Sequence, residues 1–294
     1  MYYRRRIILA LLQRFGGALP HTDFQKYLFL FNQLREEPAY EFVPYKYGMF
    51  SFQSYADMRT MEKYNQVADS KSVWRKTDKT DYLKTLEHRD AEIVEQVYND
   101  FHKLSGSALI RYVYQHYPYY AINSEIASLH LNANELASIR RSKPSVAGNC
   151  LFTIGYEGSS IERYMNILIQ NGVVLLCDVR RNPISMKYGF SKKQLQDIAQ
   201  KLGIDYMHIP ELGIESSKRK SLKTANDYAA LFEEYERKHL PEHITSLEYI
   251  HDLIKNRERV AMTCFEREHI YCHRHKVANA IQHLPGWNIP VTHL

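Results

Sequence analysis

Five short apolar runs in the second half of the chain constrain its fold more than any other feature. The runs cover residues 151–156, 173–179, 204–209, 259–263 and 288–293. Helical patterns separate them, over residues 160–170, 191–202, 225–239, 243–256 and 273–284. Near-continuous apolar strands that alternate with helices are typical of a mainly parallel sheet covered on both faces. We therefore expect an α/β domain over residues 150–294.

The first half, residues 1–140, shows a different pattern. Its periodicity predicts helices over residues 4–15, 22–35, 53–64, 91–104 and 106–116, with β-like runs at 40–45 and 72–76. Three helices followed by a basic hairpin are typical of a winged-helix module that docks on a duplex. A helical dimerisation or docking domain explains the same pattern equally well. The two halves meet in a polar stretch at residues 140–149, which contains Pro144 and Gly148.

Composition narrows the class of protein. The 294 residues carry a net charge of +6, which permits binding to a polyanion without requiring it. No apolar run approaches the roughly 20 residues of a membrane span. The N-terminus superficially resembles a signal peptide, but Gln13 and Arg14 interrupt its apolar part, so we expect an amphipathic helix and a cytoplasmic protein. Four cysteines do not make a disulfide framework, and we expect Cys150 and Cys177 to be inert core thiols.

Polar side chains follow four of the five predicted strands. In a parallel sheet the carboxyl ends of the strands share one edge, where ligands bind. We therefore expect these side chains to form one site. The segments are residues 155–158, 178–183, 210–213 and 264–274.

Among these segments, residues 178–183 carry the most charge. Asp178 follows a buried strand, so it is either a catalytic carboxylate or the ion-pair partner of Arg180 or Arg181. Two arginines and Asn182 suit phosphate oxygens. Gly155-x-x-Gly158 lacks the further residues of a phosphate-binding loop and alone indicates only a tight turn.

The segment from Cys264 to Arg274 is the densest in reactive groups, and it admits three interpretations. A zinc site could use Cys264, Cys272, His269 and either His273 or His275, although the C-x7-C-H spacing matches no common zinc finger. A reactive thiolate could form at Cys272, beside a histidine and an arginine at a helix N-terminus. In the third interpretation the thiols only pack, and Glu266, His273 and Arg274 do the chemistry.

The ordered blocks TIGYEG (153–158), DVRRNP (178–183), GFS (189–191), PELG (210–213) and CFE…CHR (264–274) resemble those of the domain-of-unknown-function 488 family. The resemblance covers the chain from residue 151 onward. It implies a Rossmann-like α/β fold with a site at the sheet edge, and it implies no activity. Residues 42–48 are similar to helix-rich extensions of winged-helix or antitoxin-associated type.

These features predict an enzyme that acts on DNA. The leading hypothesis is a DNA glycosylase-like hydrolase of modified or foreign DNA, active in antiviral defence and needing no cofactor or metal. Its partner would be DNA and not a membrane, and a homodimer is compatible with the pattern. The alternatives are a thiol-dependent transferase at Cys264 or Cys272, and a DNA-binding regulator whose α/β domain senses a small anion. The predicted catalytic residues are Asp178, Glu266, Glu211, Cys264, Cys272 and His273, and the predicted substrate-binding residues are Tyr156, Glu157, Arg180, Arg181, Asn182, Phe190 and Arg274.

Overall fold

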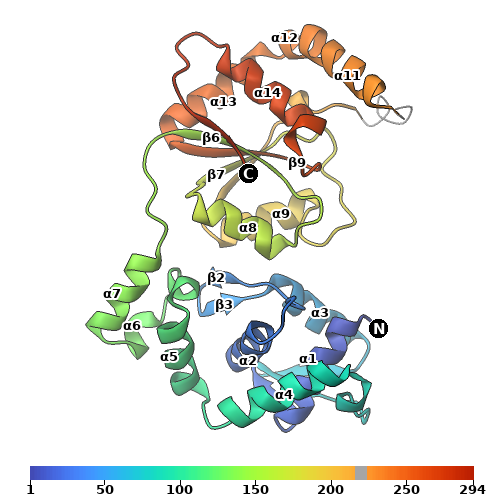
Figure 1. Ribbon diagram of the computed structural model, residues 1–294, viewed down its shortest axis with the longest axis vertical. Coiled ribbons are helices and arrows are strands. Elements are labelled where there is room, and N and C mark those ends of the chain that lie inside the picture. Colours follow the sequence, from blue (N-terminus) through green and yellow to red (C-terminus); the bar gives the residue numbers. More distant parts are fainter. Residues whose placement is uncertain (216–223) are drawn as a thin grey trace. The chain divides into compact units, whose positions relative to one another are not determined.

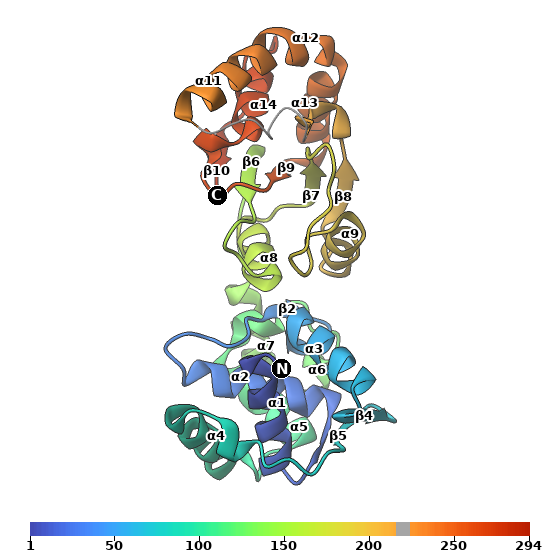
Figure 2. The same ribbon diagram turned by 90° about the vertical axis from the view of Figure 1, so that its right-hand side faces the viewer.

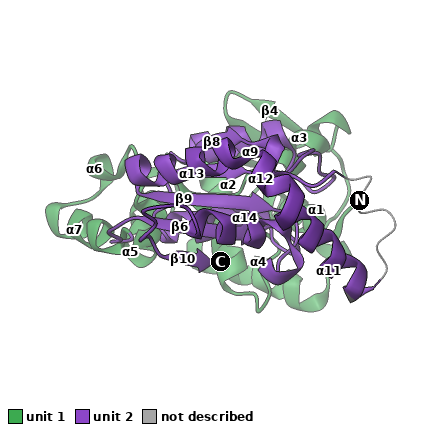
Figure 3. Cartoon of the chain, turned by 90° about the horizontal axis from the view of Figure 1, so that it is seen from above, with its two compact units in different colours: residues 1–143 green, residues 144–294 purple. Residues whose placement is uncertain are grey.

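A computed structural model describes residues 1–215 and 224–294 of the chain. Residues 1–143 and 144–294 form two compact units, coloured separately in Figure 3. Each unit has its own apolar core, as expected when a chain of this length folds as two domains.

The N-terminal unit is mostly helical. Its helices are α1 (Tyr3–Arg14), α2 (His21–Gln33), α3 (Phe52–Lys63), α4 (His88–Phe101), α5 (Gly106–His116), α6 (Ala127–His130) and α7 (Ala133–Ser142), with 3-10 turns η1 (Leu83–Thr85) and η2 (Pro118–Ala121). Its strands are β1 (Ala18–Pro20), β2 (Val43–Tyr45), β3 (Gly48–Phe50), β4 (Val67–Ser70) and β5 (Val73–Lys76).

Helices α1, α2 and α3 precede the β4–β5 hairpin, which is the order predicted for a winged-helix-like unit (Figure 2). β1 pairs with β5 and completes an antiparallel sheet in the order β1-β5-β4. All five predicted helices are present. The middle of α1 is buried on every side, because Ile7 to Leu12 are all buried, and so α1 is not the amphipathic helix that the pattern predicts. The pattern missed the short strands β1, β3 and β4 and the helices α6 and α7. Because α7 continues to Ser142, the polar break begins at residue 143 and not at 140.

The C-terminal unit contains five strands. They are β6 (Cys150–Gly155), β7 (Leu175–Asp178), β8 (Asp205–His208), β9 (Arg259–Cys264) and β10 (Val291–His293). Its helices are α8 (Ile161–Gln170), α9 (Lys192–Lys201), α11 (Ala225–Glu234), α12 (Leu240–Glu242), α13 (Ile244–Arg257) and α14 (His273–Gln282), with the π-helical turn η4 (Tyr235–His239) and the 3-10 turns η3 (Pro210–Leu212) and η5 (His269–Tyr271).

The five strands form one parallel sheet in the order β10-β6-β9-β7-β8. Helices α8 and α9 cover one face, and α13 and α14 cover the other (Figure 1). The predicted parallel α/β fold is therefore confirmed. The strand order differs from that of a dinucleotide-binding Rossmann sheet, in which the first strand neighbours the second, because here β9 lies between β6 and β7.

Burial explains the apolar runs. β6, β7 and β9 lie inside the sheet, and nearly every residue along them is buried. Strands that are covered on both faces need apolar side chains on both sides, so they show no alternation. Among the helices of the described residues, none combines the length and the apolar character that a membrane crossing requires.

Candidate functional site

The carboxyl ends of β7 and β9 border the point where the chain changes direction across the sheet. From β7 the chain continues to the neighbouring strand β8, whereas from β9 it continues the opposite way, past β6 to β10. Ligands of open α/β sheets bind outside the strand ends at such a switch point. A pocket of about 330 Å³ lies here. Its lining comprises Tyr156, Arg180, Arg181, Asn182, Ile184, Ser185, Met186, Ile214, Cys264, Phe265 and His273.

Asp178 is a buried ion-pair partner rather than a carboxylate facing the pocket. It is fully buried, and both oxygens accept hydrogen bonds from Arg180: Nε to Oδ1 at 2.8 Å and Nη2 to Oδ2 at 2.5 Å. Tyr206 OH also donates to Oδ2 at 2.7 Å. Burial opposes the charge on Arg180, but the hydrogen bonds and charge of Asp178 outweigh it and raise the pKa of the guanidinium. Of the two alternatives that the sequence left open for Asp178, the geometry therefore favours the ion pair.

The two aromatic residues predicted to bind substrate, Tyr156 and Phe190, are both buried, and Tyr156 lines the pocket. Phe190 is fully buried and stacks on Tyr156 with ring centroids 4.3 Å apart. Tyr156 is 3% exposed, and its hydroxyl accepts a hydrogen bond from Arg180 Nη1 at 3.0 Å. These rings hold Arg180 in place. Phe265 also lines the pocket and is much more exposed than Tyr156, with 45% of its surface exposed.

Two thiols, an imidazole and a carboxylate converge where β9 ends. His273 Nδ1 lies 3.6 Å from Cys264 Sγ and 3.8 Å from Cys272 Sγ. Cys264 Sγ donates to Glu266 Oε2 at 3.4 Å on its other side. Cys264, Cys272 and His273 are all buried, and Cys264 and His273 also line the pocket. The segment after β9 therefore brings these four residues together.

The other histidines that the sequence suggested as zinc ligands point elsewhere. The His269 ring stacks on His293 at 3.8 Å, and the His275 ring bonds to the carbonyl oxygen of Cys272. Cys272 does lie at the N-terminus of α14, as predicted. However, burial and the neighbouring Cys264 raise the pKa of the Cys272 thiol well above its ordinary value. Cys177, in the core, has its pKa raised to about 12 by burial, as expected for an inert thiol.

Arg274 holds the loop that carries Glu266 and does not face a phosphate. It is fully buried, and its guanidinium donates to the carbonyl oxygens of Glu266 at 2.5 Å and Arg267 at 2.8 Å. Gly155 allows the same loop to pass directly over β6, since a Cβ at this position would overlap the Glu266 carbonyl oxygen. Strand and helix thus fix the backbone on both sides of the cluster.

The remaining predicted residues lie at the surface around this centre. Arg181 and Asn182 are exposed and line the pocket. Glu157 is exposed, and its carboxylate accepts a hydrogen bond from the backbone N–H of Arg267 at 3.1 Å. Glu211 lies on η3 outside this pocket's lining. The sequence did not predict roles for Tyr206 and Phe265. The face of a sheet or loop on which a ring lies depends on its neighbours in space, which the sequence pattern does not reveal.

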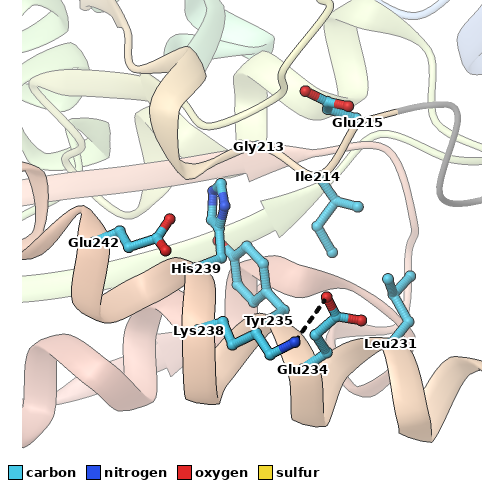
Figure 4. Close-up of a pocket in the computed structure, with 9 residues that line it drawn as sticks. All are labelled: Gly213, Ile214, Glu215, Leu231, Glu234, Tyr235, Lys238, His239 and Glu242. Carbon is cyan, nitrogen blue, oxygen red and sulfur yellow. Dashed lines mark ion pairs between the residues drawn. The ribbon is translucent and has the colours of Figure 1, made fainter.

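A second hollow, of about 230 Å³, lies over η4 and α12 (Figure 4). Its charges are mixed: Lys238 pairs with Glu234, and His239 bonds to the carbonyl oxygen of Glu211. His239, Glu242 and His243 bring three potential metal ligands close together, but Glu242 is exposed. We regard this group as a weaker candidate than the buried cysteine–histidine cluster.

The N-terminal unit has a pocket of its own, of about 290 Å³, between α2, the β2–β3 hairpin and the β4–β5 hairpin. Aromatic side chains dominate its lining: Tyr45, Tyr47, Phe50, Tyr55 and Trp74. Lys26 also lines it, although only 1% of its surface is exposed. The ammonium donates to the Tyr47 carbonyl oxygen at 3.0 Å, and burial lowers the pKa of Lys26 to about 8.

We expect Lys26→Met to stabilise the protein at pH 7 and to lose much of that gain at higher pH. Because the pKa of Lys26 falls on folding, the unfolded chain binds the proton more tightly, and this penalty disappears as the pH rises from 8 toward 10.5. The stability difference between variant and wild type should shrink by about 2 kcal/mol between pH 7 and 9.5. Urea unfolding measures it. Lys63→Met, at an exposed position on α3, is the control and should show no such pH dependence.

Comparison with known proteins assigns the C-terminal unit. Residues 160–281 match the model of the Domain of unknown function DUF488. The C-terminal unit carries a DUF488 domain. The matched region spans β7, β8, β9 and α14, and so includes most of the pocket lining. No curated protein and no solved structure matches the chain. The predicted resemblance is therefore confirmed, while the activity of this DUF488 domain has to be argued from its site.

Proposed function

We propose that the DUF488 domain of this protein is a hydrolase acting on nucleic acid, with Glu266 as its reacting carboxylate. The observation that carries this proposal is the position of Glu266. Its carboxylate does not itself line the pocket at the switch point, but it lies 3.4 Å from Cys264, which lines that pocket together with Arg181 and Asn182. A carboxylate close to a positively lined pocket suits the hydrolysis of an anionic substrate.

Glu266 replaces Asp178 as the best candidate for this role. Asp178 would have to give up Arg180 and Tyr206 before it could contact substrate, and breaking a buried ion pair costs about 3–5 kcal/mol. Arg180 is committed to the same pair. The side chains open to phosphate oxygens in the pocket are therefore those of Arg181 and Asn182.

The bond we propose is the N-glycosidic bond between a base and its sugar. Its cleavage passes through an oxocarbenium-like state, which a carboxylate stabilises while it orients the attacking water. The water oxygen bonds to the sugar carbon, and a proton goes to the departing base. The exposed ring of Phe265 offers a surface on which an extruded base could stack.

Features of the N-terminal unit support nucleic acid as the substrate class. The β4–β5 hairpin and the loop after it expose Lys71, Arg75 and Lys79. Cations on a hairpin that follows three helices suit contacts to phosphates. The aromatic pocket around Lys26 adds stacking surfaces in the same unit. The more specific role, action on modified or foreign DNA in antiviral defence, stays a prediction.

Glu266→Gln tests the proposal. With duplexes that carry modified bases, wild type should generate abasic sites, detected as alkali-labile strand breaks. The variant should be slower by about 10²–10⁴-fold, the usual contribution of an acid–base group. Glu268→Gln, two residues away at an exposed position, is the matched control and should keep wild-type rates. Equal rates for both variants, or no abasic sites from wild type on any modified duplex, would contradict the proposal.

A thiol-dependent transferase is the second candidate, because Cys264 Sγ lies 3.6 Å from His273 Nδ1 at the pocket wall. A thiol paired with an imidazole can act as a nucleophile. This alternative predicts that one thiol alkylates rapidly near pH 7 and that Cys264→Ser abolishes turnover while Glu266→Gln does not.

A further inference from the structure

We infer that Cys264, Cys272 and His273 form a zinc-binding site in the DUF488 domain, with a fourth coordination position directed toward the pocket. The three residues supply two thiols and one imidazole nitrogen, and all three potential ligand atoms lie within 4.8 Å of one another. Cysteine and histidine are the side chains that zinc prefers, and three protein ligands with one open position are typical of catalytic zinc.

The distances fit a zinc ion closely. With Zn–S bonds of about 2.3 Å and a Zn–N bond of about 2.0–2.1 Å, tetrahedral angles place sulfur and nitrogen about 3.6 Å apart. The observed separations from His273 Nδ1 are 3.6 Å to Cys264 Sγ and 3.8 Å to Cys272 Sγ. Both nitrogen–sulfur separations are therefore close to those that the ion requires.

The orientation of His273 supports the same conclusion. Its Nε2 lies 3.0 Å from the carbonyl oxygen of Val179, and a carbonyl can only accept, so Nε2 carries the proton. Nδ1 then presents its lone pair toward both sulfurs. Metal-binding histidines almost always donate from the second ring nitrogen to a carbonyl or carboxylate in this way. The Val179 carbonyl belongs to the segment directly after β7, so the sheet itself orients the ligand.

The backbone holds the two cysteines rigidly. Cys264 ends β9, where it pairs with Gly155 of β6, and Cys272 is the residue before α14. Arg274 fixes the intervening loop through the carbonyl oxygens of Glu266 and Arg267. A metal site built on a strand end and a helix start needs little rearrangement on binding, which favours affinity.

The open side of the site is the one that borders the pocket. Cys264 and His273 line the pocket and Cys272 does not, so water or substrate would reach the ion past the first two. Zinc lowers the pKa of bound water to about 7, and Glu266, beside Cys264, could accept its proton. This last step rests on the proposed function, whereas the binding of zinc does not.

Metal content of the full-length protein tests the site without reference to activity. Protein produced with added zinc should hold about one zinc ion per chain, and Cys264→Ser, Cys272→Ser and His273→Ala should hold less than about a tenth of that. Cys150→Ser, at a buried cysteine of the same unit but outside the group, is the matched control and should keep the metal. Wild type and Cys150→Ser without metal would overturn the inference.

Cobalt substitution keeps the test decisive if a cysteine variant fails to fold. Wild-type protein stripped by a chelator and titrated with Co²⁺ should develop the thiolate charge-transfer and intense visible bands of a tetrahedral two-sulfur site. Zinc should abolish these bands and protect two thiols from alkylation. An octahedral spectrum, or unchanged alkylation of both thiols, would overturn the site.

Glu266→Gln separates this inference from the proposed function. The variant should bind zinc like wild type while losing turnover. A zinc-free wild type with an inactive Glu266→Gln would reject the metal site and leave the hydrolase proposal standing. Full zinc occupancy of the protein, together with wild-type turnover in Glu266→Gln, would support the metal site and reject the hydrolase proposal.

Discussion

Asp178→Asn is expected to lower the free energy of unfolding of the C-terminal unit by about 3–5 kcal/mol, because it leaves Arg180 buried without its counter-charge. The guanidinium is 6% exposed and has Asp178 as its carboxylate partner. In the variant an amide NH₂ replaces one carboxylate oxygen, so that it faces the N–H donors of Arg180. Urea unfolding, followed by circular dichroism, measures the loss.

Asp205→Asn is the matched control for this prediction. Asp205 pairs with Arg257 in the same unit, but the two side chains are 60% and 43% exposed, and such pairs contribute less than about 1 kcal/mol. The double variant D178N/R180M should recover part of the lost stability, since no unpaired charge remains. Equal effects of Asp178→Asn and Asp205→Asn would show that the buried pair is not what holds the β7 end together.

The fold of the C-terminal half could be predicted from sequence because burial acts on every residue of an element at once. The inner strands β6, β7 and β9 are covered on both faces, so their apolar runs stand out against the helical periods between them. The strand order could not be predicted in the same way. The strand β9 lies between β6 and β7 because of pairing between segments far apart in the sequence. Any of the apolar runs would suit that position equally well.

The location of the site was predictable for a similar reason, since parallel strands bring their carboxyl ends to one edge. The roles of individual charges were not. Asp178 ends β7 and Arg274 lies in the first turn of α14, positions at which a residue that faces the pocket would look the same in the sequence. Their burial follows from what packs over them, such as Tyr206 from the next strand and the loop carbonyls of Glu266 and Arg267.

Two short elements, the strand β1 and the helix α7, were not predicted, for different reasons. β1 has three residues and exists through its pairing with β5, whose Trp74 is buried and stacks on His21 at the start of α2. The helix α7 carries a complete capping box at Asn132 and Glu135, a signal that is visible in the sequence. A single sequence therefore carries the signal for α7 but none for β1.

Gly155→Ala is expected to disrupt the site, because position 155 of the C-terminal unit has no room for a side chain. A Cβ at residue 155 would overlap the carbonyl oxygen of Glu266, a backbone atom that cannot rotate away. The loop from Cys264 to Arg267 must then move, and Arg274 must lose or lengthen its bonds to it. Overpacking of this kind costs about 1–3 kcal/mol or more. We expect a loss of about 3 kcal/mol in urea unfolding, together with loss of the cobalt bands proposed for Cys264, Cys272 and His273.

Gly158→Ala separates this steric effect from the general cost of replacing a glycine. Gly158 has a φ of +72°, and a Cβ there meets no atom within 4 Å. Alanine at this position pays only the conformational penalty of the left-handed region, about 1–2 kcal/mol. The Gly158→Ala protein should keep its metal-dependent spectrum and its turnover. If Gly155→Ala kept them too, the loop after β9 would have room that the geometry denies it, and the rigid placement of Cys264 and Glu266 would have to be abandoned.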